Sequence, residues 1–171
     1  MVIFLPLALI FILFLFFIYY KLKVNNKIII INGPNLNLLG EREQSLYGDL
    51  TLSQVETNCR KIASELNMEI DFKQSNIEGE LVELIQNSRN HYNGIIINAA
   101  AFTHTSVAIR DALSILKFPS IEIHISNIYK REEFRQKSLI SSVVTGGIFG
   151  VGVECYNLAL RAIKQILENG N

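Results

Sequence analysis

The chain has 171 residues, and its 16 lysines and arginines balance 16 aspartates and glutamates. This length suits one domain with a sizeable core, and the absence of a basic excess argues against a nucleic-acid partner. The two cysteines, Cys59 and Cys155, fall in segments with helical spacing and are predicted to be reduced and structural. The three histidines are scattered, and no cluster has the spacing of a metal site.

The first 20 residues are apolar except for Pro6, and the stretch from Val2 to Tyr20 is long enough to span a bilayer as a helix. It lacks the basic start and the small-residue cleavage site of a secretory signal. Lysines follow it at positions 21, 23 and 27, so the positive-inside rule places the rest of the chain in the cytoplasm. We interpret residues 1–23 as a membrane anchor, with residues 2–20 in the bilayer. The alternative is a start-site artefact, with the true start near Val24.

The first predicted strand is the apolar run Lys27–Ile31, which is typical of a strand buried on both faces in a parallel sheet. It leads into a loop that begins with Asn32 and continues to about Leu50. Such a loop lies at the carboxyl edge of the sheet, where open α/β folds bind ligands. Its length, and an arginine (Arg42) five residues before a tyrosine (Tyr47), indicate chemistry more than connection.

Thr51 and Gln54 have the spacing of a capping box and open a helix predicted to run to about Asn67. The later elements alternate in type. They are a strand at 68–73, a helix opened by residues 76–80, a strand at 95–98, a helix at 105–116, a strand at 120–125, a short charged helix at 131–136, a strand at 143–144, and a last helix, preceded by Gly146, Gly147 and Gly150, to about 168. This alternation predicts an α/β fold, a doubly wound five-stranded parallel sheet of flavodoxin-like order, within one catalytic domain over residues 24–171.

Three of the predicted strands end in polar residues: Asn32–Asn37, Asn98, and His124–Asn127. The carboxyl ends of parallel strands share one edge of the sheet, so we expect these side chains to form a site. The glycines at 146–150 lack the spacing of either nucleotide-binding fingerprint, so nucleotide binding is not expected.

From Lys27 to about Glu168 the chain resembles the type II 3-dehydroquinate dehydratases (type II dehydroquinases). The motifs that carry the resemblance are Asn32–Arg42 with Tyr47–Gly48, Gln74–Leu81, Ile97–Asp111, and Ile121–Asn127 followed by Arg131–Arg135. The resemblance implies a flavodoxin-like fold, a trimer-based homododecamer, no metal and no cofactor. It also implies loss of water from 3-dehydroquinate to give 3-dehydroshikimate, in the shikimate or quinate pathway. Gln44 departs from the family, in which proline is common at this position, and the N-terminal segment lies outside the family pattern.

An elimination of this kind needs a base, a group that stabilises the enolate, and an acid for the departing hydroxyl. By the resemblance, Tyr47 is the base and His124 the acid. Arg42 favours the phenolate of Tyr47, because an ordinary tyrosine, with a pKa of about 10, is ionised to only about one part in a thousand at pH 7. Asn35 holds the water that stabilises the enolate oxygen. Glu122, on the same strand face as His124, orients or charges the imidazole, and its alternative is a solvated strand residue.

The resemblance also assigns the substrate contacts. Asn98, with the backbone amides of Ile125 and Ser126, holds the carboxylate, since amides at a strand end are apt anion donors. The hydroxyls are contacted by His104, Asp111 and Arg135, with Asp111 reaching across from a neighbouring subunit. Every matched catalytic position is filled, which favours an enzyme over the alternative of a catalytically idle, membrane-tethered scaffold with the same fold.

Overall fold

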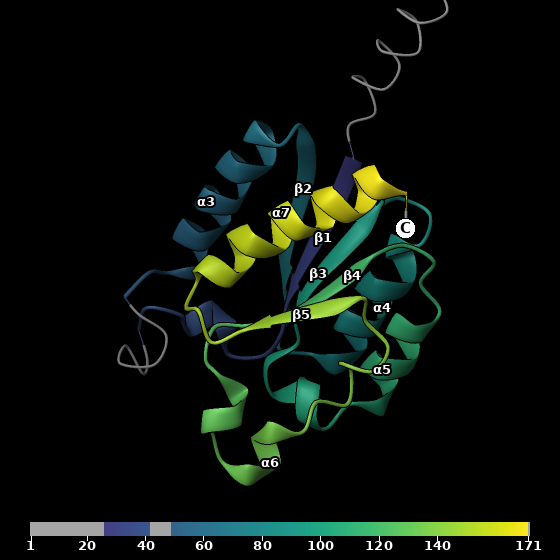
Figure 1. Cartoon of the computed structure of the whole chain (residues 1–171). Helices are drawn as coiled ribbons and strands as arrows, with labels where there is room; N and C mark the ends of the chain where they lie inside the picture. Colours follow the sequence, from purple (N-terminus) through teal and green to yellow (C-terminus); the bar gives the residue numbers. More distant parts are fainter. Residues whose placement is uncertain (1–25, 42–48, 171) are drawn as a thin grey trace, which may run out of the picture.

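The computed structural model describes residues 26–41 and 49–170, and its centre is a five-stranded, all-parallel sheet in the order β2-β1-β3-β4-β5 (Figure 1). This is the flavodoxin-like order predicted from the sequence. The strands are β1 (Asn26–Asn32), β2 (Met68–Gln74), β3 (Gly94–Asn98), β4 (Ser120–His124) and β5 (Gly146–Phe149). The helices are α3 (Leu52–Glu65), α4 (Glu78–Ser88), α5 (Val107–Ser114), α6 (Glu133–Gln136) and α7 (Glu154–Asn169), with short 3-10 turns η1 (Leu36–Leu38), η2 (Ala100–His104) and η3 (Ile128–Lys130).

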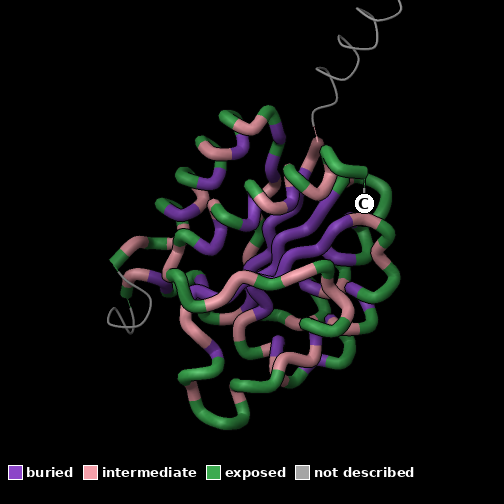
Figure 2. Tube along the Cα trace, in the orientation of Figure 1, coloured by how far each residue is buried: buried purple, intermediate pink, exposed green. Residues whose placement is uncertain are grey.

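The three central strands β1, β3 and β4 are buried on both faces, as the apolar runs predict (Figure 2). In β1, Ile28 and Ile30 pack in a core with α3 and α7, whereas Ile29 and Ile31 pack in a second core with α4 and α5. Successive side chains of a strand point to opposite faces, so one strand supplies both cores. The two cysteines lie buried and unbridged in the first of these cores.

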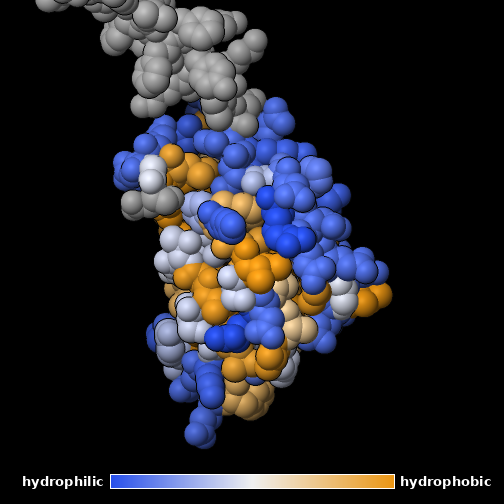
Figure 3. Space-filling model, turned by 90° about the vertical axis from the view of Figure 1, so that its right-hand side faces the viewer, coloured by the Kyte–Doolittle hydropathy of each residue, from blue (hydrophilic) through white to orange (hydrophobic). Residues whose placement is uncertain are grey.

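The helices begin where the sequence offers caps. The Thr51 hydroxyl accepts a hydrogen bond from the Gln54 backbone amide, and the Gln54 side chain accepts one from the Thr51 amide, which confirms the predicted capping box. Ser106 caps α5 in the same way through the amide of Ile109. Figure 3 views the molecule from the side on which α4 and α5 lie in Figure 1, and apolar residues gather on this face among polar ones.

One predicted strand was wrong. The segment with Val143 and Val144 forms turns, and the fifth strand is Gly146–Phe149. The two valines pack against the core beside α4 and α5, which accounts for apolar residues here without a strand. At Gly147 a Cβ would lie 2.3 Å from the ring of Phe149, so a larger residue there would require that ring to move. Glycines weaken a strand pattern in the sequence, and this hid the element.

Other predicted elements differ at their ends: α5 begins at Val107 and α6 only at Glu133. The predicted anchor at residues 2–20 lies outside the described residues. Within 26–41 and 49–170, none of the helices has the length and hydrophobicity needed to cross a membrane.

Candidate active site

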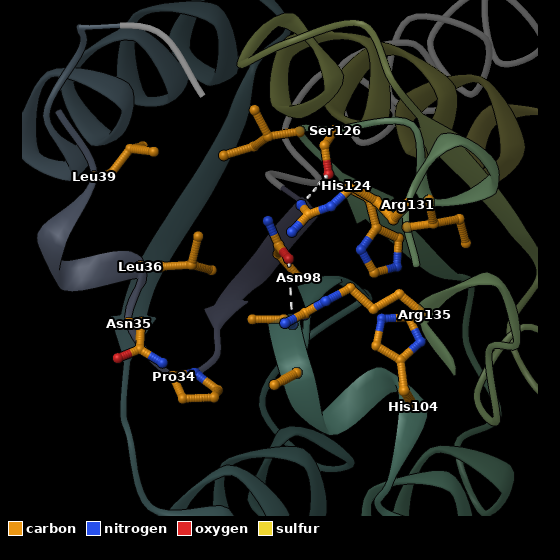
Figure 4. Close-up of a pocket in the computed structure, with 14 residues that line it drawn as sticks. Pro34, Asn35, Leu36, Leu39, Asn98, His104, His124, Ser126, Arg131 and Arg135 are labelled. Atoms are coloured by element: carbon orange, nitrogen blue, oxygen red, sulfur yellow. Dashed lines mark hydrogen bonds between the residues drawn. The ribbon is translucent and has the colours of Figure 1, made fainter. Parts of the chain in front are cut away.

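A cavity of about 210 Å³ opens at the carboxyl edge of the sheet, over the ends of β1, β3 and β4 (Figure 4). This is the edge at which the polar strand ends were expected to meet. Its lining consists of Pro34, Asn35, Leu36, Leu39, Asn98, Ala100, Ala101, His104, His124, Ile125, Ser126, Ile128, Arg131 and Arg135. The wall is thus apolar on one side and carries imidazole, guanidinium and amide groups on the other, as is usual for a small-molecule site.

His124 lies at the end of β4, and its Nε2 is 2.8 Å from Oε1 of Glu122, two residues earlier on the same strand face. Glu122 is 0% exposed, which excludes the alternative of a solvated strand residue. Its carboxylate also accepts hydrogen bonds from the hydroxyls of Ser138 (2.9 Å) and Ser141. We refer to these four residues as the carboxylate cluster.

The carboxylate cluster keeps Glu122 ionised. Burial alone would raise the pKa of the Glu122 carboxyl, but hydrogen bonds from His124, Ser141 and Ser138 and the nearby imidazole outweigh burial, and the pKa lies below its ordinary value. An ionised carboxylate only accepts hydrogen bonds, so Nε2 of His124 carries a proton.

His104 stands beside His124, with the two rings stacked and their centroids 6.2 Å apart. Nδ1 of His104 is 2.9 Å from the backbone oxygen of Lys137. Burial, together with the neighbouring His124 and Arg135, lowers the pKa of His104, although the Lys137 carbonyl acts in the opposite sense. The neutral ring is therefore favoured, with its proton on Nδ1 because a carbonyl only accepts.

Asn98, at the end of β3, belongs to a chain of hydrogen bonds that crosses the sheet beneath the cavity. Asn32 donates from Nδ2 to the Lys73 carbonyl (3.0 Å), and the buried Tyr156 hydroxyl donates to Asn32 Oδ1 (2.6 Å). Asn98 Nδ2 in turn donates to the Tyr156 oxygen (3.4 Å), and the Ala100 amide donates to Asn98 Oδ1 (3.3 Å). We call Asn32, Tyr156 and Asn98 the amide chain.

At each end the amide chain meets a backbone group with only one possible role, the Lys73 carbonyl as acceptor and the Ala100 amide as donor. The direction of every bond between them is therefore fixed. Asn98 uses one proton of its amide nitrogen on Tyr156, and the second proton is available to the cavity. This is the geometry that an anion-binding amide needs.

Two guanidinium groups, those of Arg131 and Arg135, point into the cavity (Figure 4). Arg131 donates to the Ser126 hydroxyl at 3.4 Å, and both arginines lie within 3.3 Å of the Glu132 carboxylate. Two cations facing one small cavity make the site suited to an anionic ligand.

Asn35 lies at the rim of the cavity, in left-handed backbone conformation (φ 65°). Its backbone amide donates to the side-chain oxygen of Asn76 at 2.8 Å. Ala100, across the cavity, also has positive φ (50°). A non-glycine residue in this region costs about 1 kcal/mol or more, and such strain is typical of functional sites.

The structure thus brings together most of the residues predicted for the site: Asn35, Glu122, His124, Asn98, His104, Ile125, Ser126 and Arg135. It does not bring Asp111 there. That side chain is 65% exposed on α5 and pairs with Arg110. Arg42 and Tyr47 lie outside the described residues.

Sequence reasoning missed Arg131 and Tyr156. Arg131 stands in the same motif as Arg135, four residues earlier, and this spacing was the available signal. Tyr156 lies among the apolar residues of α7 and is fully buried. A hydroxyl within an apolar helix face needs a buried partner, and this was its signal.

The comparisons with known proteins agree with this geometry. Residues 26–164 match the sequence model of the family described as dehydroquinase class II. The chain belongs to this family. A 3-dehydroquinate dehydratase of Campylobacter jejuni is 54% identical over 142 residues, which cover 83% of this chain and 89% of the relative. The 3-dehydroquinate dehydratase of Endomicrobium trichonymphae is 52% identical, over 82% of this chain and 99% of the relative.

Among class II dehydroquinases with solved structures, the type II dehydroquinase of Propionibacterium acnes superposes with a TM-score of 0.80 at 38% identity, covering 82% of this chain and 97% of that one. The enzyme of Butyrivibrio crossotus superposes equally well at 40% identity, over 81% and 97%. In the part of the chain that the structure describes, no three His, Cys, Asp or Glu side chains are grouped to hold a metal ion.

Proposed function

We propose that this chain is a 3-dehydroquinate dehydratase, a hydro-lyase that converts 3-dehydroquinate to 3-dehydroshikimate by anti elimination of water through an enolate. The observation that carries the proposal is the buried Glu122–His124 pair, which faces a cationic cavity in a chain of the class II dehydroquinase family. The reaction belongs to the shikimate pathway of aromatic amino-acid biosynthesis or to quinate catabolism.

The substrate is an anion, and the cavity is suited to one. The free amide proton of Asn98 and the backbone amides of Ile125 and Ser126 receive its carboxylate. His104 and Arg135, which also line the cavity, contact its hydroxyls. The resulting binding geometry holds the ring in one orientation, which an anti elimination requires because the proton and the hydroxyl leave from opposite faces.

His124 is the acid. Its Nε2 proton is engaged by Glu122, so the proton delivered to the departing hydroxyl comes from Nδ1 of the doubly protonated ring. The buried negative charge of Glu122 stabilises the imidazolium before the proton is given up. The hydroxyl then leaves as water, and the ring keeps its Nε2 proton.

Tyr47 is the base that removes the proton next to the ketone, and Arg42 favours its phenolate. Both assignments come from the family motif, as both residues lie outside the described part of the chain. Asn35, at the rim of the cavity, holds the water that stabilises the enolate oxygen. We expect Tyr47→Phe to abolish turnover and to leave the fold intact. A near-normal rate in this variant would remove Tyr47 from the role.

We further propose that the chain forms a trimer-based homododecamer. Asp111 is exposed on α5 and does not line the cavity of its own chain, which supports its reaching the substrate of a neighbouring subunit. Val107 and Ile115 are large apolar residues exposed on or next to the same helix. Sedimentation of the purified chain measures the assembly, and a monomer with full activity would contradict the contribution of Asp111.

The N-terminal segment, residues 2–20, is proposed to tether a cytoplasmic catalytic domain to the membrane. Cell fractionation tests this. Full-length native protein recovered wholly in the soluble fraction would exclude the tether.

The deciding experiment for the enzyme is the ultraviolet absorbance of the conjugated enone product, measured with purified full-length chain and 3-dehydroquinate. We expect absorbance to rise with time. Ligand binding without turnover would instead support the alternative, an idle scaffold with the same fold.

A further inference from the structure

We propose that segment 137–141 is a positioning strap that holds both histidines of the cavity, with Ser141 and Ser138 as positioning residues that act on His124 through Glu122. The inference deepens the proposed function and rests on it. Neither serine lines the cavity, and both donate to the Glu122 carboxylate, which is the route by which they would act on the reaction.

The first argument is that the strap completes the hydrogen bonding of a buried charge. Glu122 is fully buried, and an isolated carboxylate in such a place would be strongly disfavoured. Oε1 accepts from His124 (2.8 Å) and from Ser138 (2.9 Å), and Oε2 accepts from Ser141. Two of the three donors are therefore hydroxyls of the strap, and they favour the charged form.

The second argument is that the direction of the Ser138 bond is fixed. The Ser138 oxygen accepts hydrogen bonds from the backbone amides of Ile140 (3.2 Å) and Ser141 (3.0 Å). Both of its lone pairs are thereby used, so its one proton points to Glu122. A protonated Glu122 would accept these three hydrogen bonds less strongly, because bonds to a charged acceptor are stronger than bonds to a neutral one.

The third argument is that the strap is firmly attached to the fold. Ile140 is fully buried in the core beside α4 and α5, and the amide of Leu139 donates to the Thr103 carbonyl at 2.9 Å. The first residue of the strap, Lys137, accepts from Nδ1 of His104 through its carbonyl. The segment thus acts on both histidines, directly on Nδ1 of His104 and, through Glu122, on Nε2 of His124.

Ser141 gives the cleaner test, because among the described residues its hydroxyl bonds to Glu122, whereas the hydroxyl of Ser138 also closes a turn. We expect Ser141→Ala to lower kcat about tenfold with little change in KM, since it removes a hydrogen bond to a charged group that acts on the acid step. Ser141→Thr, which restores a hydroxyl, is expected to recover most of the rate.

The matched control is Ser142→Ala. It removes a hydroxyl from the adjacent, exposed residue, which does not contact Glu122. Its kcat and KM are expected to equal those of the unaltered chain. Circular dichroism and the Tm of each variant show whether the fold is retained.

A double-mutant cycle with Glu122→Gln separates positioning from a structural role. If Ser141 acts through Glu122, Ser141→Ala will have little further effect on kcat once Glu122 is Gln. Equal kcat in Ser141→Ala and Ser142→Ala, or a full tenfold loss that persists in the Glu122→Gln background, would overturn the proposal. Absence of turnover in the unaltered chain would instead overturn the proposed function, so the two failures are distinguishable.

Discussion

The amide chain and the carboxylate cluster lie under the same cavity and position their side chains in different ways. The amide chain is neutral, and its direction is set by a backbone carbonyl at one end and a backbone amide at the other. The carboxylate cluster contains a buried charge whose direction depends on Glu122 being ionised. A neutral chain suits substrate binding, because asparagine does not titrate and burial raises the pKa of Tyr156 well above its ordinary value. A charged cluster suits proton transfer, because it can stabilise an imidazolium.

The largest effect on kcat is expected from a change in the carboxylate cluster. Glu122→Gln keeps the shape of the side chain but removes the charge opposite His124, and we expect kcat to fall about a hundredfold, since a positioned general acid contributes 10²–10⁴-fold. KM is expected to change little. Steady-state kinetics measures both. Glu133→Gln makes the same change at an exposed residue of α6, and its kinetics should be unaltered.

A change in the amide chain should alter KM, whereas a change in the carboxylate cluster should alter kcat. Tyr156→Phe removes the hydrogen bonds that Asn32 Oδ1 and Asn98 Nδ2 make to the Tyr156 hydroxyl, so the free energy of unfolding should fall by about 1–3 kcal/mol. With Asn98 no longer oriented, KM is expected to rise about fivefold to tenfold at nearly constant kcat. Urea unfolding and steady-state kinetics measure the two effects.

The control for that prediction is Tyr129→Phe, which deletes the same hydroxyl from an exposed ring. If both tyrosine variants have the same KM, the amide chain does not orient Asn98. A fall in kcat without a rise in KM for Tyr156→Phe would contradict the assignment of the amide chain to binding and of the carboxylate cluster to proton transfer.

The two networks should also differ in their response to acid. The pKa of Glu122 is lowered in the folded chain, so its carboxylate contributes stability that is fully present above the ordinary value of 4.5 and is lost as pH falls through the lowered value. The stability difference between the unaltered chain and Glu122→Gln should therefore shrink as the pH falls through that acid range. The difference for Tyr156→Phe should stay constant there. Urea unfolding at a series of pH values measures both, and a pH-independent Glu122→Gln difference would contradict the expected contribution.

The smallest effect is expected at a polar pair outside the cavity, on the edge strand β2. Asp71 accepts from the Tyr92 hydroxyl at 2.5 Å and pairs with Lys27 at 2.8 Å, but its side chain is 35% exposed. Asp71→Asn should cost about 1 kcal/mol or less because solvent screens the pair. Its kcat and KM should match those of the unaltered chain. A loss of activity would show that polar networks of this sheet influence turnover regardless of their place.

The meeting of the polar strand ends could be predicted because it follows from topology alone. Parallel strands place Asn32, Asn98 and His124 at one edge whatever surrounds them. The contact between Glu122 and His124 follows from the two-residue period of a strand in the same way.

What could not be predicted depends on segments that meet only in three dimensions. Tyr156 is 124 residues from Asn32 in sequence, and Ser141 is 19 from Glu122. No local pattern links such pairs. The fifth strand was missed because its two glycines weaken the pattern that usually identifies a strand.

The lack of a side chain at Gly33 allows the loop after β1 to lie close to the end of β3. The Gly33 amide donates to the Asn98 carbonyl at 2.7 Å, and a Cβ at this position would lie 2.4 Å from the backbone oxygen of Ala99. The backbone of Ala99 cannot move aside as a flexible side chain would. Substitution at position 33 should therefore be poorly tolerated. Tolerance should be far higher at Gly79 and Gly146, where a Cβ would meet open space.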